Sequence, residues 1–145
     1  MTEQIFAGVD VGASRTKTAV VDDDKRLLGY SVLKSGTHFE ASAALALKKA
    51  LEMANVSEKA ICRCVATGYG RRNVAAADRT HTEIGCHARG CYHYFHTALT
   101  IVDIGGQDNK VITIDEKGRR LGFKMNRKCA AGTGAFLEEM SARLE

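Results

Sequence analysis

The chain has 145 residues, of which 45% are hydrophobic and 26% are charged, and its formal net charge is +4. This composition is typical of a globular protein of one or perhaps two small domains, and no apolar run approaches the ~20 residues that span a bilayer. We therefore expect no membrane protein, and because the charge is mild and there are only five Phe, four Tyr and no Trp, we expect no nucleic-acid-binding protein either.

The first part of the chain predicts three strands followed by alternating helices and strands. Apolar and β-branched runs predict strands over residues 5–9, 16–21 and 27–33, and helical spacing of Ala and Leu predicts an amphipathic helix over 40–55. The next expected elements are a strand over 61–67, a short helix over 71–78, a short strand over 80–84 and a helix over 85–95. This order, βββαβαβα, predicts an α/β domain with layers of helix and sheet.

The order of elements then starts again. Residues 99–103, 109–114 and 119–124 predict three more strands, and residues 135–144 predict an amphipathic helix, which gives βββα. The sequence itself repeats at an offset of 93 residues. The matched pairs are Asp10 and Asp103, Gly12 and Gly105, Lys17 and Lys110, Asp22 and Asp115, Arg26 and Arg119, Leu28 and Leu121, and Gly29 and Gly122.

Each copy places an Asp at the end of an apolar strand, before a turn that contains Gly. Such a carboxylate can hold Mg²⁺, and the backbone N–H groups of a tight turn can bind phosphate oxygens. The expected nucleotide-binding residues are Asp10, Gly12, Ala13, Ser14, Arg15, Thr16, Lys17, Asp103, Gly105, Gly106 and Gln107, with Asp10 and Asp103 as the Mg²⁺ ligands. The alternative is a pair of ordinary β-hairpins. Neither the Walker loop nor the dinucleotide-binding glycine pattern is present.

In its order of elements and its twin turns, the chain resembles the superfamily of actin, sugar kinases and heat-shock chaperones. The resemblance implies an actin-like (ribonuclease H-like) fold, with a first domain over residues 1–97 and the start of a second over 98–145. Because the second copy stops inside its first helix, we expect an N-terminal fragment. Glu83 stands where the superfamily often has a residue that orients water, although it could be a polar strand end. Gln107 and Asp108 are the other candidates for this role.

Four motifs carry a narrower resemblance, to the BadF/BadG/BcrA/BcrD-type ATPases. They are ATGYGR (66–71), TEIGCHA (82–88), DIGGQD (103–108) and NRKCAAGTGAFLE (126–138). This family comprises activators of 2-hydroxyacyl-CoA dehydratases and ATPase subunits of benzoyl-CoA reductases, and the last motif weakly favours the benzoyl-CoA reductase branch. Ala13 departs from the family, which usually has a hydroxyl residue at that position.

The resemblance implies ATP, Mg²⁺ and a 4Fe–4S cluster shared across a homodimer or pseudo-dimer, with Cys129 as a cluster ligand. It also implies reductase or dehydratase subunits as partners, and ferredoxin or flavodoxin as the electron donor. A helix start and the basic Arg127 and Lys128 would stabilise a thiolate at Cys129, although a lone Cys before a helix is the alternative. The family's second cluster cysteine lies further along the chain and is absent here.

The other cysteines favour structural roles. Cys62 and Cys64 alternate on a strand, so we expect both in the core. The residues Cys86, His87, Cys91, His93 and His96 fit no common zinc spacing. An odd count of five cysteines without a secretory signal predicts a cytoplasmic protein. Two other functions remain open at this point, a sugar or acyl kinase and an inactive remnant.

Overall fold

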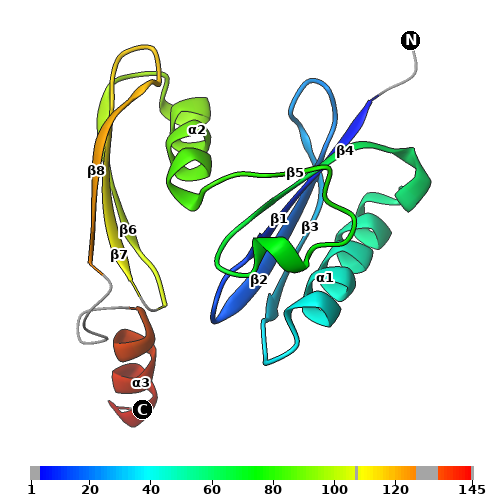
Figure 1. Ribbon diagram of the computed structural model, residues 1–145, viewed down its shortest axis with the longest axis horizontal. Coiled ribbons are helices and arrows are strands. Elements are labelled where there is room, and N and C mark those ends of the chain that lie inside the picture. Colours follow the sequence, from blue (N-terminus) through cyan, green and yellow to red (C-terminus); the bar gives the residue numbers. More distant parts are fainter. Residues whose placement is uncertain (1–3, 107, 127–133, 145) are drawn as a thin grey trace. The chain divides into compact units, whose positions relative to one another are not determined.

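The computed structural model describes residues 4–106, 108–126 and 134–144. The chain forms two packed units, Met1–Thr82 and Glu83–Glu145 (Figure 1). In the described residues no helix is both long and apolar enough to cross a membrane.

The first unit is a five-stranded sheet with one long helix on it (Figure 1). The strand order is β3-β2-β1-β4-β5; β1, β2 and β3 form an antiparallel meander, and β4 and β5 run parallel to β1 and to each other. The elements are β1 (Ile5–Val11), β2 (Arg15–Val21), β3 (Leu27–Lys34), α1 (Phe39–Ala54), η1 (Glu58–Ala60), β4 (Ile61–Thr67), η2 (Arg71–Asn73) and β5 (Arg79–Thr80).

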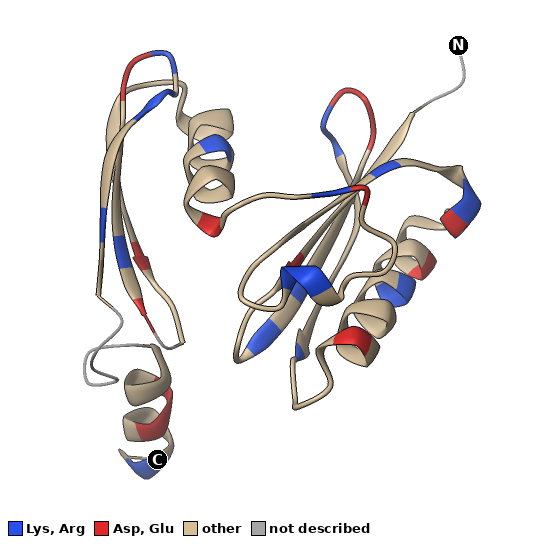
Figure 2. Ribbon diagram, viewed as in Figure 1, with Lys and Arg blue, Asp and Glu red and all other residues tan. Residues whose placement is uncertain are grey.

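Small residues let α1 approach the sheet closely. Its buried side chains are mostly Ala, and a Cβ added to Gly29 of β3 would lie 2.3 Å from the carbonyl oxygen of Ala50. The hydroxyl of Ser31 donates to the carbonyl of Ala46 at 2.7 Å, which ties the strand to the helix backbone. Charged positions of both signs remain on α1, among them the pair Lys48 and Glu52 at 3.9 Å (Figure 2). The apolar face of this sheet is therefore closed by one amphipathic helix.

The expectation that Cys62 and Cys64 both lie in the core is wrong for Cys62. Cys64 is buried, whereas Cys62 is exposed. The pairing of β1 with β4 skips Cys62, because Ile5 pairs with Ile61 and Phe6 pairs with Arg63. An extra residue at a bulge breaks the alternation of faces.

The second unit is a three-stranded antiparallel sheet, in the order β6-β7-β8, with α2 packed on one face (Figure 1). Ile84 and Ala88 of α2 bury Ile101, Ile112 and Ile114 of the sheet. The elements are α2 (Glu83–Phe95), β6 (Leu99–Ile104), β7 (Asn109–Ile114), β8 (Arg120–Asn126) and α3 (Gly134–Leu144).

The sequence repeat is also a structural repeat. At the β2–β3 turn, Asp22 Oδ1 accepts from the backbone N–H of Arg26 at 2.8 Å, and at the β7–β8 turn Asp115 Oδ1 accepts from Arg119 at 2.8 Å. The register also shifts at equivalent places, between residues 20 and 21 and between residues 113 and 114. The two hairpins therefore share the same register shift and the same hydrogen bond in the turn.

Two element boundaries differ from expectation. The helix expected over 71–78 is only the short turn η2, and the strand expected over 80–84 ends at Thr80, so that Glu83 begins α2. The packed units separate after Thr82, because Ile84 and Ala88 of α2 pack on the second sheet. The domain boundary expected at 97/98 stays a prediction.

Candidate functional site

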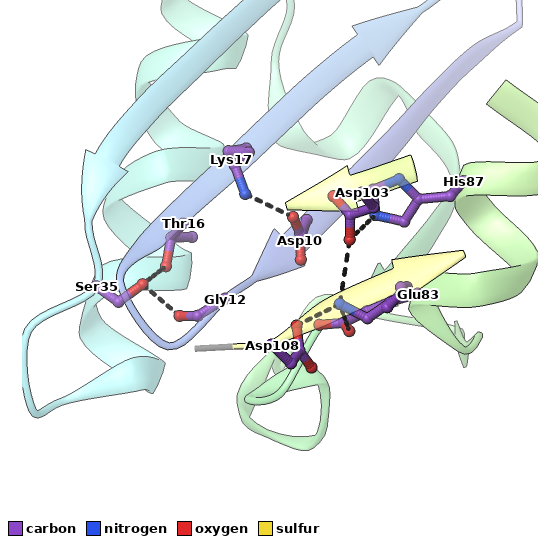
Figure 3. Close-up of polar contacts among 10 residues, drawn as sticks. Asp10, Gly12, Thr16, Lys17, Ser35, Glu83, His87, Asp103 and Asp108 are labelled. Atoms are coloured by element: carbon purple, nitrogen blue, oxygen red, sulfur yellow. Dashed lines mark hydrogen bonds and ion pairs between the residues drawn. The ribbon is translucent and has the colours of Figure 1, made fainter. Parts of the chain in front are cut away.

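The first turn follows directly from the end of β1. Asp10 pairs with Lys17 across the β1–β2 ladder, and Lys17 Nζ donates to Asp10 Oδ2 at 2.9 Å (Figure 3). The N–H of Gly12 donates to the carbonyl of Arg15 at 3.1 Å, which closes the turn. A Cβ at Gly12 would lie 2.8 Å from that carbonyl oxygen, so only glycine fits without a shift.

A second backbone segment covers the Asp10 carboxylate. Gly68, after β4, has φ +90°, and a Cβ there would lie 2.4 Å from Asp10 Oδ1. Asp10 Oδ1 is buried and accepts no hydrogen bond from the part of the chain that the structure describes. Because Mg²⁺ prefers carboxylate oxygens, an unpartnered buried oxygen beside a tight turn fits a metal ligand.

The shape of the first turn depends on Ser35, which follows β3. Ser35 Oγ donates to the carbonyl of Gly12 at 2.6 Å and also lies 2.9 Å from Thr16 Oγ1 (Figure 3). The backbone N–H of Ser35 donates to the carbonyl of Ser14 at 2.9 Å. Ser35 and Thr16 are both buried. The hydroxyl of Thr16, which we expected to contact phosphate, is therefore engaged inside the protein and holds the turn in place.

The second turn has the same construction. Asp103 pairs with Lys110 across the β6–β7 ladder, and Lys110 Nζ donates to Asp103 Oδ2 at 3.1 Å. The N–H of Gly105 donates to the carbonyl of Asp108 at 2.8 Å, as Gly12 does to Arg15 in the first turn. The start of α3 is tied to this turn, because Gly134 N–H donates to the Gly105 carbonyl at 2.8 Å.

Lys110 differs from Lys17 in its surroundings. Its side chain is 3% exposed, and besides Asp103 it contacts Asp108 Oδ1 at 2.5 Å and Glu83 Oε2 at 3.3 Å. We call these four residues the Lys110 network; its three carboxylates converge in Figure 3. Burial by itself lowers the pKa of Lys110, but the hydrogen bonds to Asp108 and Asp103 and the charge of Glu83 outweigh it and raise the pKa. The ammonium stays charged.

His87 extends this network on the α2 side. Its Nε2 lies 3.7 Å from Asp103 Oδ2, one helical turn after Glu83. Among the described residues no three His, Cys, Asp or Glu side chains are arranged to hold a metal ion. The cation that lies among the carboxylates of Asp103, Asp108 and Glu83 is the ammonium of Lys110.

The structure brings most of the expected residues into two groups. Asp10 and Lys17 lie together with Gly12 in the first unit, and Glu83 lies with Asp103 in the second. Ala13, Ser14 and Arg15 lie in and beside the first turn, and Gly105 and Gly106 lie in the second. Gln107 and Cys129 lie outside the described residues.

Three residues of the sites were not expected from the sequence. Gly68 covers Asp10, Ser35 holds the first turn, and Lys110 gathers three carboxylates. The repeat already pairs Lys110 with Lys17, so this signal was available for Lys110. For Ser35 and Gly68 the contacts join segments 23 and 58 residues from the turn (12 to 35 and 10 to 68), and local patterns do not report them.

Comparisons with known proteins agree with the family expected from the sequence motifs. The model of the BadF/BadG/BcrA/BcrD ATPase family matches residues 7–145. The chain is 46% identical over 138 residues to the "Activator of lactoyl-CoA dehydratase" of Anaerotignum propionicum, an alignment that covers 95% of this chain and 53% of that protein.

Many solved structures match the fold. Component A of the (R)-2-hydroxyglutaryl-CoA dehydratase of Acidaminococcus fermentans has a TM-score of 0.89 at 37% identity, over 97% of this chain and 54% of that one. The activator of the 2-hydroxyisocaproyl-CoA dehydratase from Clostridium difficile, solved with bound ADPNP, has a TM-score of 0.89 at 36% identity, over 97% and 52%. These matches confirm the expected actin-like α/β fold. The chain spans about half the length of the relatives that it matches.

Proposed function

Because the chain belongs to the BadF/BadG/BcrA/BcrD ATPase family, we propose that it supplies the two phosphate-binding turns of an ATPase that activates a 2-hydroxyacyl-CoA dehydratase. The observation that carries this proposal is the pair of matching turns, each with an Asp–Lys pair at a strand end and a Gly N–H bonded to the carbonyl three residues on. The similarity to dehydratase activators leads us to propose that branch rather than the benzoyl-CoA reductase branch.

In this proposal each turn binds phosphate oxygens through its backbone N–H groups, and Lys17 adds a cation beside them. Asp10 and Asp103 would hold Mg²⁺, which supplies charge neutralisation to the phosphate chain when bound. Asp10 is the better supported ligand, because its Oδ1 is buried and unpartnered in the described part of the chain.

Glu83 is the proposed residue that orients water for hydrolysis. It lies at the start of α2, 3.3 Å from Lys110, on the same face of the second sheet as Asp103. Gln107 and Asp108 remain further candidates. The Asp108 Oδ1 atom already forms an ion pair with Lys110 Nζ at 2.5 Å, so Asp108 is a weaker candidate than Glu83 for orienting water.

The electron-transfer part of the proposal rests on the family alone. A 4Fe–4S cluster held by Cys129 and by a second copy of the chain would pass single electrons at low potential to the dehydratase, and ferredoxin or flavodoxin would reduce it. In the sequence Cys129 stands five residues before Gly134, whose N–H donates to the Gly105 carbonyl of the second turn at 2.8 Å, and this supports a link between the two sites.

A titration with a fluorescent ATP analogue and Mg²⁺ tests the nucleotide site. We expect Asp10→Asn and Asp103→Asn each to weaken binding at least about tenfold, which corresponds to about 1.4 kcal/mol. Asp24→Asn is the matched control, because Asp24 is an exposed hairpin aspartate that pairs with Arg26 at 2.6 Å. Equal binding by the wild type and all three variants would contradict the proposal.

Anaerobic reconstitution with iron and sulfide tests the electron-transfer part. Because this chain carries only one of the family's two cluster cysteines, a second polypeptide has to complete the site, and any brown visible absorbance gained with the wild type should be lost with Cys129→Ala. Equal absorbance in both proteins would remove Cys129 from the mechanism. Phosphate transfer to an added sugar or acyl acceptor, without iron-dependent absorbance, would favour the kinase. A chain that binds neither nucleotide nor iron would be the inactive remnant.

A further inference from the structure

The two repeated lysines have different environments, although the repeat places them at the same position. Lys17 is 52% exposed, and within the described residues its one ion pair is with Asp10. Lys110 is 3% exposed and makes ion pairs with Asp103, Asp108 and Glu83. A buried lysine with three carboxylate partners is expected to have a different role from an exposed lysine with one carboxylate partner.

The formal charge of the Lys110 network suggests the role of this lysine. Three carboxylates and one ammonium leave a formal net charge of −2, and removing the lysine would leave −3. Carboxylates in one site repel each other unless a cation lies among them, and a buried cation is stable only with such partners. Lys110 therefore holds the three oxygens at one point, which is what a bound divalent cation does.

The distances show how closely the ammonium takes a metal ion's place. The three carboxylate oxygens lie 2.5, 3.1 and 3.3 Å from Lys110 Nζ. Mg²⁺–oxygen distances are about 2.0–2.1 Å, so the carboxylates would have to move inward by about 0.4 Å (Asp108) to about 1.3 Å (Glu83) to bind the metal. A metal and the ammonium cannot occupy this point together.

We propose that Lys110 is a positioning residue that fills the cation position of the second turn and keeps divalent metal out until a nucleotide binds. The arriving phosphate oxygens offer Lys110 another anionic partner, and the lysine then releases Asp103 for the metal. Metal binding at the second turn is thereby made conditional on nucleotide. The conditional step rests on the proposed function, whereas the exclusion of metal without nucleotide does not.

Binding of Mn²⁺ alone to the 145-residue chain, followed by electron paramagnetic resonance, tests the exclusion. We expect Lys110→Met to bind one Mn²⁺ at least about tenfold more tightly than the wild type, because one positive charge within about 4 Å is lost. Lys110→Arg keeps the charge and should bind like the wild type. Lys17→Met is the matched control in the first turn, and its gain should be smaller because the lysine that it removes is half exposed and screened by solvent.

A double variant locates the gained site. Adding Asp103→Asn to Lys110→Met should return Mn²⁺ affinity to the wild-type value. If Lys110→Met does not fold, as judged by circular dichroism, Lys110→Gln keeps a hydrogen-bond donor without the charge and should show the same gain. An unchanged Mn²⁺ affinity in the folded uncharged variant, or a gain that survives Asp103→Asn, would overturn the proposal. A lysine that served only to stabilise the fold would give that unchanged affinity.

A second titration, with Mn²⁺ and the non-hydrolysable analogue ADPNP, separates the two proposals. With ADPNP present, the wild type should bind Mn²⁺ at least about tenfold more tightly than without it, and Lys110→Met should gain less. If ADPNP does not bind to any variant, the proposed function fails while the Mn²⁺-only comparison still decides the role of Lys110. If ADPNP binds but leaves the wild-type Mn²⁺ affinity unchanged, the conditional step is wrong.

Discussion

Replacing Gly29 by alanine should push α1 away from the first sheet. A Cβ at this position would lie 2.3 Å from the carbonyl oxygen of Ala50 and 2.7 Å from the backbone nitrogen of Ala54. Both atoms belong to the helix backbone, so no side-chain rotation relieves the collision. The helix has to move by about 1 Å to restore an ordinary contact of about 3.5 Å.

The cost follows from what this shift exposes. Overpacking of a closed interface costs about 1–3 kcal/mol, and a gap of up to 1 Å loses a quarter to a half of each van der Waals contact under the helix. Because alanine has less freedom than glycine in the unfolded chain, about 0.5 kcal/mol is regained. We expect Gly29→Ala to lower the free energy of unfolding of the first unit by about 2 kcal/mol.

Hydrogen–deuterium exchange read by mass spectrometry measures this effect in each unit separately. Peptides from α1 should exchange about 30-fold faster in Gly29→Ala, because every 1.4 kcal/mol is about tenfold in the opening equilibrium. Gly122→Ala is the matched control: it is the same position of the repeat, and nothing lies within 4 Å of its added Cβ. Unchanged exchange of α1 in Gly29→Ala, or an equal loss of protection around residue 122 in the control, would refute this reasoning.

Three further experiments test other parts of the structure. Ser35→Ala should lower the free energy of unfolding by about 2 kcal/mol in urea denaturation, because a buried turn carbonyl loses its donor; a loss below about 0.5 kcal/mol would contradict this. Gly68→Ala should lower the free energy of unfolding by about 3 kcal/mol, and Gly36→Ala should lower it by about 1 kcal/mol. Both residues have positive φ, but only Gly68 has backbone within 2.5 Å of the added Cβ. Equal losses of stability in the two variants would rule out the collision. Alkylation at pH 8, mapped by peptide mass spectrometry, should modify Cys62 well before Cys64, whose pKa is raised by burial and nearby carboxylates; equal rates would contradict the bulge.

The sequence predicted the parts of the fold that depend on local patterns. Alternating apolar residues predicted the strands, helical spacing predicted α1, and the 93-residue repeat predicted two hairpins with an Asp before each turn. The bulge that turns Cys62 outward could not be predicted, because it depends on the pairing of β4 with β1. Glu83 was expected at a strand end, but α2 begins there, and this brings its carboxylate to Lys110.

The candidate site was predictable only as far as each turn is a local structure. Asp10, Gly12 and Lys17 follow one another within eight residues, and their copies do the same, so residue spacing was sufficient. The covering of Asp10 by Gly68 and the support of the turn by Ser35 both join residues that are distant in sequence. Such contacts are set by which strands and loops become neighbours, and one sequence does not report that.

The packing of the helices explains why the lysines of two similar turns have different surroundings. In the first unit α1 packs on Val9 and Val11, and Thr18, which pairs with Val9, is buried on the same face of the sheet; Asp10 and Lys17 lie on the opposite face. In the second unit α2 packs on the face of Asp103, which buries the second lysine and brings Glu83 to it.

The opposite face of the second sheet shows the other consequence of this packing. Val102, Ile104 and Val111 are 65%, 54% and 39% exposed, although their counterparts in the first unit are buried. The repeat therefore determines the turn, and the position of the neighbouring helix determines whether its lysine stays exposed or is held among carboxylates. A helix on the Asp103 face is thus the structural basis of the proposed control of metal binding by Lys110.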